Sequence, residues 1–229
     1  IQGAGGVIIP PETYWPAIQR ICDDNEILLV ADEVITGFGR LGEWFGSTTY
    51  EIKPDLIPFA KGVTSGYLPL GGVLVNDKVA DILIEKGGEF IHGFTYSGHP
   101  VSCAVAIANI KILAEDNVIE TVKEHTAPYL AKRWQSLSDH PIVGEARIKG
   151  LVAALELCKD KKTGKRFPAE HNVGSLCRDL AIENGLVMRA VGDTMIIAPP
   201  LIITHEQIDE LIAKAISTLD ATAAAVKTT

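Results

Sequence analysis

The sequence lacks several features that mark common classes of protein. Its cysteines are far apart and form no CxxC pair, which argues against a zinc site and against a disulfide framework. Basic residues are also scarce, because Lys plus Arg is 21 against 29 for Asp plus Glu, a formal charge of -8. We therefore expect no metal, no nucleic-acid partner and four reduced packing cysteines, namely Cys22, Cys103, Cys158 and Cys177.

Long apolar runs are missing as well. No stretch reaches the roughly 18 uninterrupted apolar residues of a membrane span, and no basic segment leads into an apolar one at the start. We expect no membrane partner and a cytoplasmic location. The sequence also begins without Met and runs from Ile1 directly into the strand-like GVIIP (6–10), which predicts that sequence upstream is missing.

What is present is enough for a real core, since 47% of the 229 residues are hydrophobic. In the first half, short apolar runs alternate with helical patterns, which predicts an α/β fold. The run EILLVADEV (26–34) is continuously apolar and is typical of a buried strand in a parallel sheet. Further strands are expected at 6–10, 55–63 and 71–76, and helices after Pro11 and at 79–87. We assign residues 1–110 to this large domain.

The second half has a different pattern and predicts a smaller α+β domain at residues 111–229, including the helices that link it. A long helical pattern breaks near Asp116, and paired strands are expected over 143–158. A hairpin should turn at Gly192–Asp193, and Thr204 should cap the last helix. A helix over 171–185 should end at Gly185.

One lysine stands out in FAKGVTSGYLPLGG (59–72), where Lys61 ends an apolar run among small residues. Asp32 ends another apolar run 29 residues earlier, which leaves room for a crossover that brings both to one edge of a sheet, where ligands of open α/β sheets bind. A lysine can bond to an aldehyde, and an aspartate can keep a pyridine nitrogen protonated. Together they describe a pyridoxal phosphate site. Spacing alone leaves open a solvated lysine and a capping carboxylate.

Several long motifs are more specific than this spacing. They are LLVADEVITGFGRLGEWFG (28–46), KPDLIPFAKGVTSGYLPLGGVLV (53–75), HGFTYSGHPVSCAVA (92–106) and VMRAVGDTMIIAPPLIITHEQIDELI (187–212). In this order they resemble the class III aminotransferases, the ω-transaminase group of the fold type I pyridoxal phosphate enzymes. The resemblance implies the C-terminal half of such a subunit: part of the cofactor-binding large domain, with a mostly parallel sheet and helices, followed by the smaller domain.

The resemblance also implies a role for individual residues. Lys61 would form the Schiff base with pyridoxal 5'-phosphate and move the proton, while Asp32 would pair with the pyridinium nitrogen. Val34 would pack on a face of the cofactor ring, and Thr95 would bind its phosphate across a dimer interface. Arg189 would grip the carboxylate of an amino or keto acid, because a guanidinium can donate two parallel hydrogen bonds to it.

The activity that the resemblance implies is transamination in two ping-pong half reactions, from an amine or ω-amino acid donor to a keto acid, with pyruvate the expected acceptor. The expected partners are these small molecules, a second copy of the chain in a homodimer or larger homo-oligomer, and the missing N-terminal half of the subunit, whose motifs are absent here. Two alternatives stay open: a catalytically incomplete fragment with a structural or assembly role, and a related fold type I mutase or racemase.

Two neighbouring features have simpler interpretations. Glu33 follows Asp32 directly, and because adjacent strand residues point to opposite faces, the two do not predict an acid–base pair. GFGRLG (37–42) lacks the lysine and the spacing of a P-loop. We interpret it as a turn through which backbone can approach the cofactor or a partner subunit.

Overall fold

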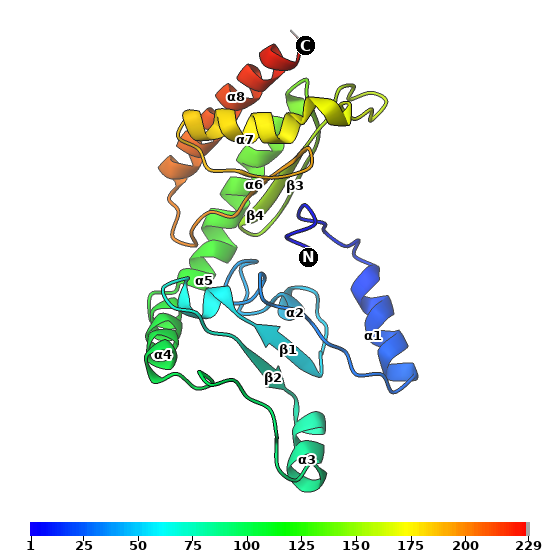
Figure 1. Ribbon diagram of the computed structural model, residues 1–229, viewed down its shortest axis with the longest axis vertical. Helices are drawn as coiled ribbons and strands as arrows, with labels where there is room; N and C mark the ends of the chain where they lie inside the picture. The colour runs from blue at the N-terminus through cyan, green and yellow to red at the C-terminus, as the bar shows by residue number, and fades with distance from the viewer. Residues whose placement is uncertain (228–229) are drawn as a thin grey trace. The chain divides into compact units, whose positions relative to one another are not determined.

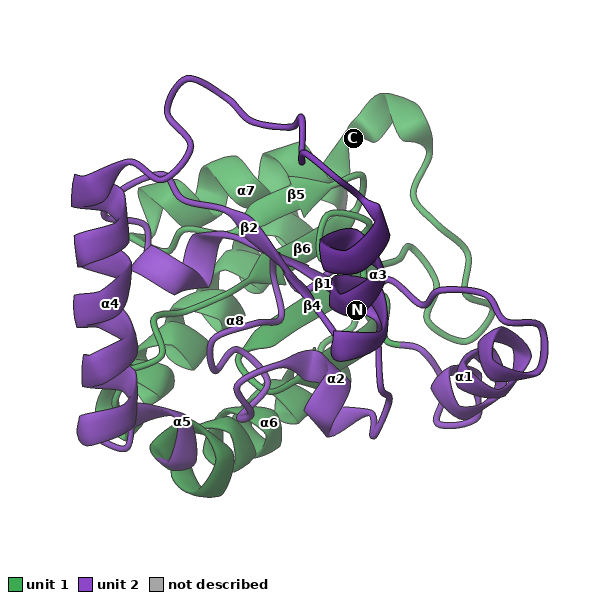
Figure 2. Cartoon of the chain, turned by 90° about the horizontal axis from the view of Figure 1, so that it is seen from below, with its two compact units in different colours: residues 1–9, 121–229 green, residues 10–120 purple. Residues whose placement is uncertain are grey.

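A computed structural model describes residues 1–227 and divides the chain into two compact units (Figures 1 and 2). Unit 1 comprises Ile1–Ile9 and Thr121–Thr229, and unit 2 comprises Pro10–Glu120. Figure 2 shows unit 1 in green and unit 2 in purple. The domain boundary expected at residue 110 stays a prediction. Among the described residues, no helix combines the length and the apolar character needed to cross a membrane.

Unit 2 contains a short two-stranded sheet and several helices. Its helices are α1 (Tyr14–Asp24), α2 (Gly46–Thr49), α3 (Asp77–Lys86) and α4 (Pro100–Glu115), with α5 (Val118–Thr121) at its border in sequence. The strands β1 (Leu56–Phe59) and β2 (Gly72–Val75) pair antiparallel. They confirm two of the predicted strands, and the end of α4 at Glu115 confirms the predicted helix break near Asp116.

The segment before Asp32 runs parallel to β1. Val30 forms a parallel bridge with Leu56, and two further backbone bonds extend the pairing: Ala31 N–H donates to the Leu56 carbonyl (3.0 Å) and Glu33 N–H to the Pro58 carbonyl (2.9 Å). The alternation of strands and helices makes the unit α/β, as predicted. The expected first strand at 6–10 is reduced to one bridge, between Gln2 and Ile8.

The expectation that residues 26–34 form a buried strand is wrong for the described chain. Ile27, Leu28 and Val30 each expose about half of their surface, although Leu29 and Ala31 are buried. The reason lies in pairing, because β1 contributes the only strand that this segment contacts within the described residues. An apolar run indicates that its side chains favour burial. They become buried only where neighbouring elements of the fold cover them.

The Asp55 side chain connects three segments of unit 2 at the start of β1. One of its carboxylate oxygens accepts from Leu29 N–H (2.8 Å), and the other accepts from the Asn76 amide (2.8 Å), which also caps α3. These hydrogen bonds, the backbone one foremost, hold the pKa of Asp55 below its ordinary value, with a smaller contribution from Lys78. The carboxylate therefore stabilises the junction of three segments.

We expect Asp55→Asn to lower the free energy of unfolding by about 1–2 kcal/mol at pH 7, because an amide cannot accept on both sides. Since the folded-state pKa lies below the unfolded one, this contribution is present above the unfolded pKa and is lost as pH falls through the folded one. Urea unfolding from about pH 7 to pH 3 should show the gap between parent and variant closing below about pH 4. Asp81→Asn, on the exposed side of α3, is the matched control. A gap that does not change with pH would contradict the assignment.

Unit 1 is built on a four-stranded antiparallel sheet of order β3-β4-β6-β5. The strands are β3 (Val143–Lys149), β4 (Val152–Leu157), β5 (Arg189–Val191) and β6 (Thr194–Ile197), and the helices are α6 (Ala127–Gln135), α7 (Val173–Glu183) and α8 (His205–Lys227). A π-helical turn (Val122–Thr126) precedes α6, and single 3₁₀ turns lie at Ser136–Asp139 and Ala169–His171. Helix α6 packs on β3, α7 packs on β5 and β6, and α8 packs on α6 and α7.

Local signals in this unit behave as the sequence predicts. The β5–β6 hairpin turns at Gly192–Asp193, and Gly185 follows α7 with a left-handed φ of 71°. The Thr204 hydroxyl accepts from Gln207 N–H (3.2 Å), while the Gln207 side chain accepts from Thr204 N–H (3.0 Å), which is a capping box. Cys158 and Cys177 are buried and free, and burial raises the pKa of both thiols, which fits packing cysteines.

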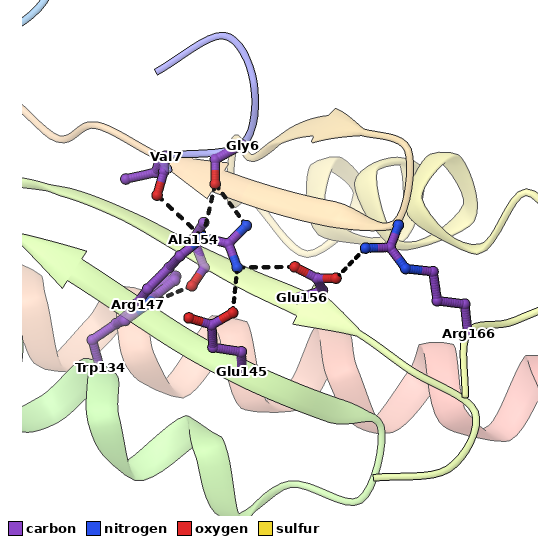
Figure 3. Close-up of polar contacts among 8 residues, drawn as sticks. All are labelled: Gly6, Val7, Trp134, Glu145, Arg147, Ala154, Glu156 and Arg166. Atoms are coloured by element: carbon purple, nitrogen blue, oxygen red, sulfur yellow. Dashed lines mark hydrogen bonds and ion pairs between the residues drawn. The ribbon is translucent and has the colours of Figure 1, made fainter. Parts of the chain in front are cut away.

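Arg147 on β3 is the centre of a polar cluster inside unit 1 (Figure 3). Its guanidinium donates to the Gly6 carbonyl (2.8 Å and 3.0 Å) and the Val7 carbonyl (3.1 Å), and it pairs with Glu145 (2.7 Å) and Glu156 (2.9 Å). Gly6 and Val7 have positive φ angles of 112° and 56°. Arg147 therefore fastens a strained N-terminal segment, more than a hundred residues away in sequence, to the sheet.

Candidate active site

Lys61 follows β1 and has an unusual backbone. Its φ is 47°, in the left-handed region that L-residues rarely occupy, and it opens a short 3₁₀ turn, Lys61–Thr64. Its side chain is exposed. Backbone strain of this kind persists only where surrounding contacts hold it, and it concentrates at functional sites.

The loop at 37–42 provides one of these contacts. A Cβ on Gly62 would lie 3.1 Å from the Gly37 carbonyl and 3.1 Å from the Phe38 Cβ, so the turn after the lysine and this loop meet at close range. Gly37 is similarly confined, because a Cβ there would lie 2.9 Å from the Glu33 carbonyl. The loop therefore lets backbone approach the Lys61 turn. Its expected approach to the cofactor or to a partner subunit stays a prediction.

Asp32 and Glu33 occupy opposite sides, as predicted. Asp32 is exposed, and one of its carboxylate oxygens accepts from Val34 N–H (3.0 Å), a short-range bond that orients the side chain. Glu33 is only 2% exposed and accepts from Gly46 N–H (2.8 Å), Ser47 N–H (2.5 Å) and the Thr36 hydroxyl. Glu33 therefore stabilises the N-terminus of α2, whereas the Asp32 side chain is exposed to solvent.

The pairing of segment 29–33 with β1 determines how the candidate residues are grouped. Because the two run parallel, Asp32 and Lys61 emerge at the same, carboxyl-terminal edge, with Val34 directly after Asp32. Thr95 lies in the exposed loop before α4, in a turn where the Ser97 hydroxyl accepts from Phe94 N–H (2.8 Å). Arg189 is exposed at the start of β5, in unit 1.

Two residues that support Lys61 were missed by sequence reasoning. Thr64 is buried, and its hydroxyl donates to the Leu68 carbonyl (2.6 Å), which closes the loop after the lysine turn. Asn109 on α4 contacts the same turn. In the sequence, Asn109 stands out only as a polar amide within the mostly apolar run SCAVAIANIKIL (102–113). This pattern does not predict which residues the amide contacts.

The side chains at this edge can be compared with the chemistry of the expected cofactor. An exposed primary amine and an exposed carboxylate come from neighbouring parallel segments, and the amine sits in a strained turn. This donor set fits an aldehyde that also carries a basic ring nitrogen, as pyridoxal phosphate does. It does not suit a metal ion, and within residues 1–227 no three His, Cys, Asp or Glu side chains gather as ligands would.

Comparison with known proteins identifies the family of the chain. The family model described as aminotransferase class-III matches residues 1–219. The chain belongs to the class III aminotransferases. A putrescine–pyruvate aminotransferase from Pseudomonas aeruginosa is 64% identical over 226 residues, covering 99% of this chain and 49% of the relative. A probable mitochondrial γ-aminobutyrate transaminase from Oryza sativa subsp. indica is 46% identical, covering 97% and 44%.

Solved structures place this class III aminotransferase chain in the same fold. An (S)-enantioselective ω-transaminase from Thermomicrobium roseum superimposes with a TM-score of 0.93 at 44% identity, covering 97% of this chain and 49% of that one. The ω-transferase from Vibrio fluvialis JS17 gives a TM-score of 0.94 at 37% identity, covering 100% and 55%. The chain therefore spans about half the length of the relatives it matches. Class III aminotransferases are fold type I enzymes that depend on pyridoxal phosphate.

Proposed function

We propose that this chain contributes to transamination dependent on pyridoxal 5'-phosphate, in which an amino group passes from an amine or ω-amino acid to a keto acid. One observation carries the proposal: Lys61 stands in a strained turn at the same carboxyl-terminal edge of the paired segments as Asp32, inside the segment that matches the family. An ordinary surface lysine needs neither the strain nor the close glycine contacts that surround it.

Each residue of the group has a separate task. Lys61 Nζ would hold the cofactor covalently and would carry the proton between substrate and cofactor, while Asp32 would keep the ring nitrogen protonated. Val34, which follows Asp32 and is partly buried, would pack against one face of the ring. When bound, the cofactor supplies an electron sink for the carbanion formed at the substrate carbon. The parallel pairing of 29–33 with β1 supports this arrangement, since it brings amine and carboxylate to one edge.

Thr95 is proposed to bind the cofactor phosphate of a second copy of the chain. The loop that carries it exposes a group of large apolar side chains, which is typical of a surface buried in an assembly. These side chains are Phe90, Ile91, Phe94 and Tyr96, each at least 73% exposed. We therefore propose a homodimer in which each site uses both copies.

Pyruvate is the proposed amino acceptor. It is supported by the name of the 64% identical putrescine–pyruvate aminotransferase, and the γ-aminobutyrate transaminases support an ω-amino acid or diamine as donor. Arg189 is proposed to bind the acceptor's carboxylate, because a guanidinium offers two parallel N–H donors.

We expect Arg189→Ala to weaken the use of pyruvate by about tenfold or more, because a charge-assisted pair is lost, while an amine without a carboxylate is affected little. The measurement is kcat/KM for pyruvate, and separately for an amine donor, in parent and variant. Arg178→Ala, on α7 in the same unit, is the control. Equal losses for both substrates would remove Arg189 from this role.

The proposed function is tested by adding pyridoxal phosphate to the protein, reducing with borohydride and locating the added mass by peptide mapping. A label on the peptide that contains Lys61, together with amino transfer to pyruvate, supports a transaminase. A label without net amino transfer favours a mutase or racemase. Absence of a label on Lys61 favours a purely structural role and overturns the proposal.

A further inference from the structure

Asn109 makes an unusual set of contacts with the turn that follows Lys61. Its side-chain nitrogen donates to the Gly62 carbonyl (3.0 Å) and to the Val63 carbonyl (3.1 Å), and its side-chain oxygen accepts from the Ser65 hydroxyl (2.6 Å). All three partners lie within four residues of Lys61, whereas Asn109 lies more than forty residues away in sequence, in the middle of α4. One side chain is therefore hydrogen-bonded to three residues of this turn.

The chemistry of the amide matches these partners. A carboxamide has two N–H donors and one oxygen acceptor, and here both donors meet carbonyls while the oxygen meets a hydroxyl. Carbonyls in a short 3₁₀ turn find few partners within the turn itself. Asn109 supplies partners for two of them, so the turn is stabilised from outside.

The turn needs such support because its backbone is strained at both ends. Lys61 has a φ of 47° and Ser65 a φ of 49°. Two non-glycine residues in the left-handed region therefore lie at the two ends of the segment to which Asn109 is hydrogen-bonded. Gly62 meets the 37–42 loop on one side, and Asn109 holds its carbonyl. If the hydrogen bonds from Asn109 are lost, the backbone at Lys61 is expected to relax and the lysine amine to change position.

We propose that Asn109 is a positioning residue for Lys61: by holding the Gly62 and Val63 carbonyls, it sets the direction in which the lysine amine leaves the sheet edge. The inference rests on the proposed function, since it concerns the reaction of that amine with the cofactor aldehyde. Asn109 itself does not touch the reacting atoms in this scheme and acts through the turn.

Two substitutions separate positioning from simple helix packing. Asn109→Asp keeps the shape and the acceptor for Ser65, but it loses both N–H donors and places a carboxylate against two carbonyl oxygens. Asn109→Ala removes every contact without adding repulsion. A packing role predicts that the isosteric Asp variant is the milder one, whereas positioning through the donors predicts that it is the more severe.

The first test needs no cofactor. Hydrogen exchange followed by mass spectrometry reports on the amides of the turn, where Ser65 N–H donates to the Gly62 carbonyl (3.2 Å) and Tyr67 N–H to the Thr64 carbonyl (3.1 Å). We expect exchange in residues 61–67 to rise by about tenfold or more in Asn109→Asp. Lys111→Ala, exposed on the same helix, should leave it unchanged.

The second test measures the rate at which pyridoxal phosphate and borohydride label Lys61. We expect the order parent, then Asn109→Ala, then Asn109→Asp, with a loss of about tenfold or more for the last and no change for Lys111→Ala. Labelling of Asn109→Asp at the parent rate overturns the inference, even if the melting temperature falls. A parent protein whose Lys61 is not labelled overturns the proposed function itself, and the inference with it. Normal labelling of the parent with unaltered Asn109 variants overturns the inference alone.

Discussion

Lys61→Ala is expected to lower the rate of amino transfer by about 10³-fold or more, since removal of a general acid–base group alone typically costs 10²–10⁴-fold and the covalent anchor is lost as well. The fold should be unaffected, because the lysine side chain is exposed and the alanine keeps the same Cβ at the left-handed position. The measurement is turnover with pyruvate as acceptor, together with the melting temperature of the same samples.

Two further variants make this result specific. Lys61→Arg keeps a positive charge at the sheet edge, but a guanidinium does not deprotonate and cannot bond to an aldehyde, so it should be as inactive as Lys61→Ala. Lys86→Ala, exposed on α3, should retain full activity. Turnover by Lys61→Ala close to that of the parent would show that another group performs the chemistry.

Arg147→Ala is expected to have the largest effect on stability, a loss of about 3–5 kcal/mol in the free energy of unfolding. The Arg147 side chain is only 14% exposed, and its removal leaves the carbonyls of Gly6 and Val7 without its donors and leaves Glu156 with Arg166 alone. Breaking a partly buried pair from one side is costly because the remaining charge stays desolvated. Urea unfolding of parent and variant measures the difference.

The neighbouring Arg166 gives a matched control, since it pairs with the same carboxylate (Figure 3). Its side chain is 73% exposed, so Arg166→Ala should cost only about 0–1 kcal/mol. Arg147→Lys should fall between the two, because a single ammonium cannot serve two carbonyls and two carboxylates in the geometry of the guanidinium. Equal losses for Arg147→Ala and Arg166→Ala would show that the cluster adds no more than a surface ion pair.

Much of the fold could be predicted from the sequence where the cause is local. The hairpin at Gly192–Asp193 and the cap at Thr204 depend on residues a few positions apart, so the chemistry of the turn is already present in the chain. The opposite directions of Asp32 and Glu33 follow in the same way from the period of a strand. The motifs around Lys61 were specific enough to indicate the family that the comparison later showed.

Only the tertiary structure decided what depends on residues far apart in sequence. The run at 26–34 has the composition of a buried strand, yet Ile27 and Val30 stay exposed because burial depends on elements that lie beside it. At the candidate site, the sequence determined the chemical identity of Lys61 and Asp32, since an amine and a carboxylate are properties of single residues. The sequence did not predict the strained backbone of Lys61 or the hydrogen bonds that Asn109 makes to the turn after it. Both arise from contacts between distant segments, which form only when the chain folds.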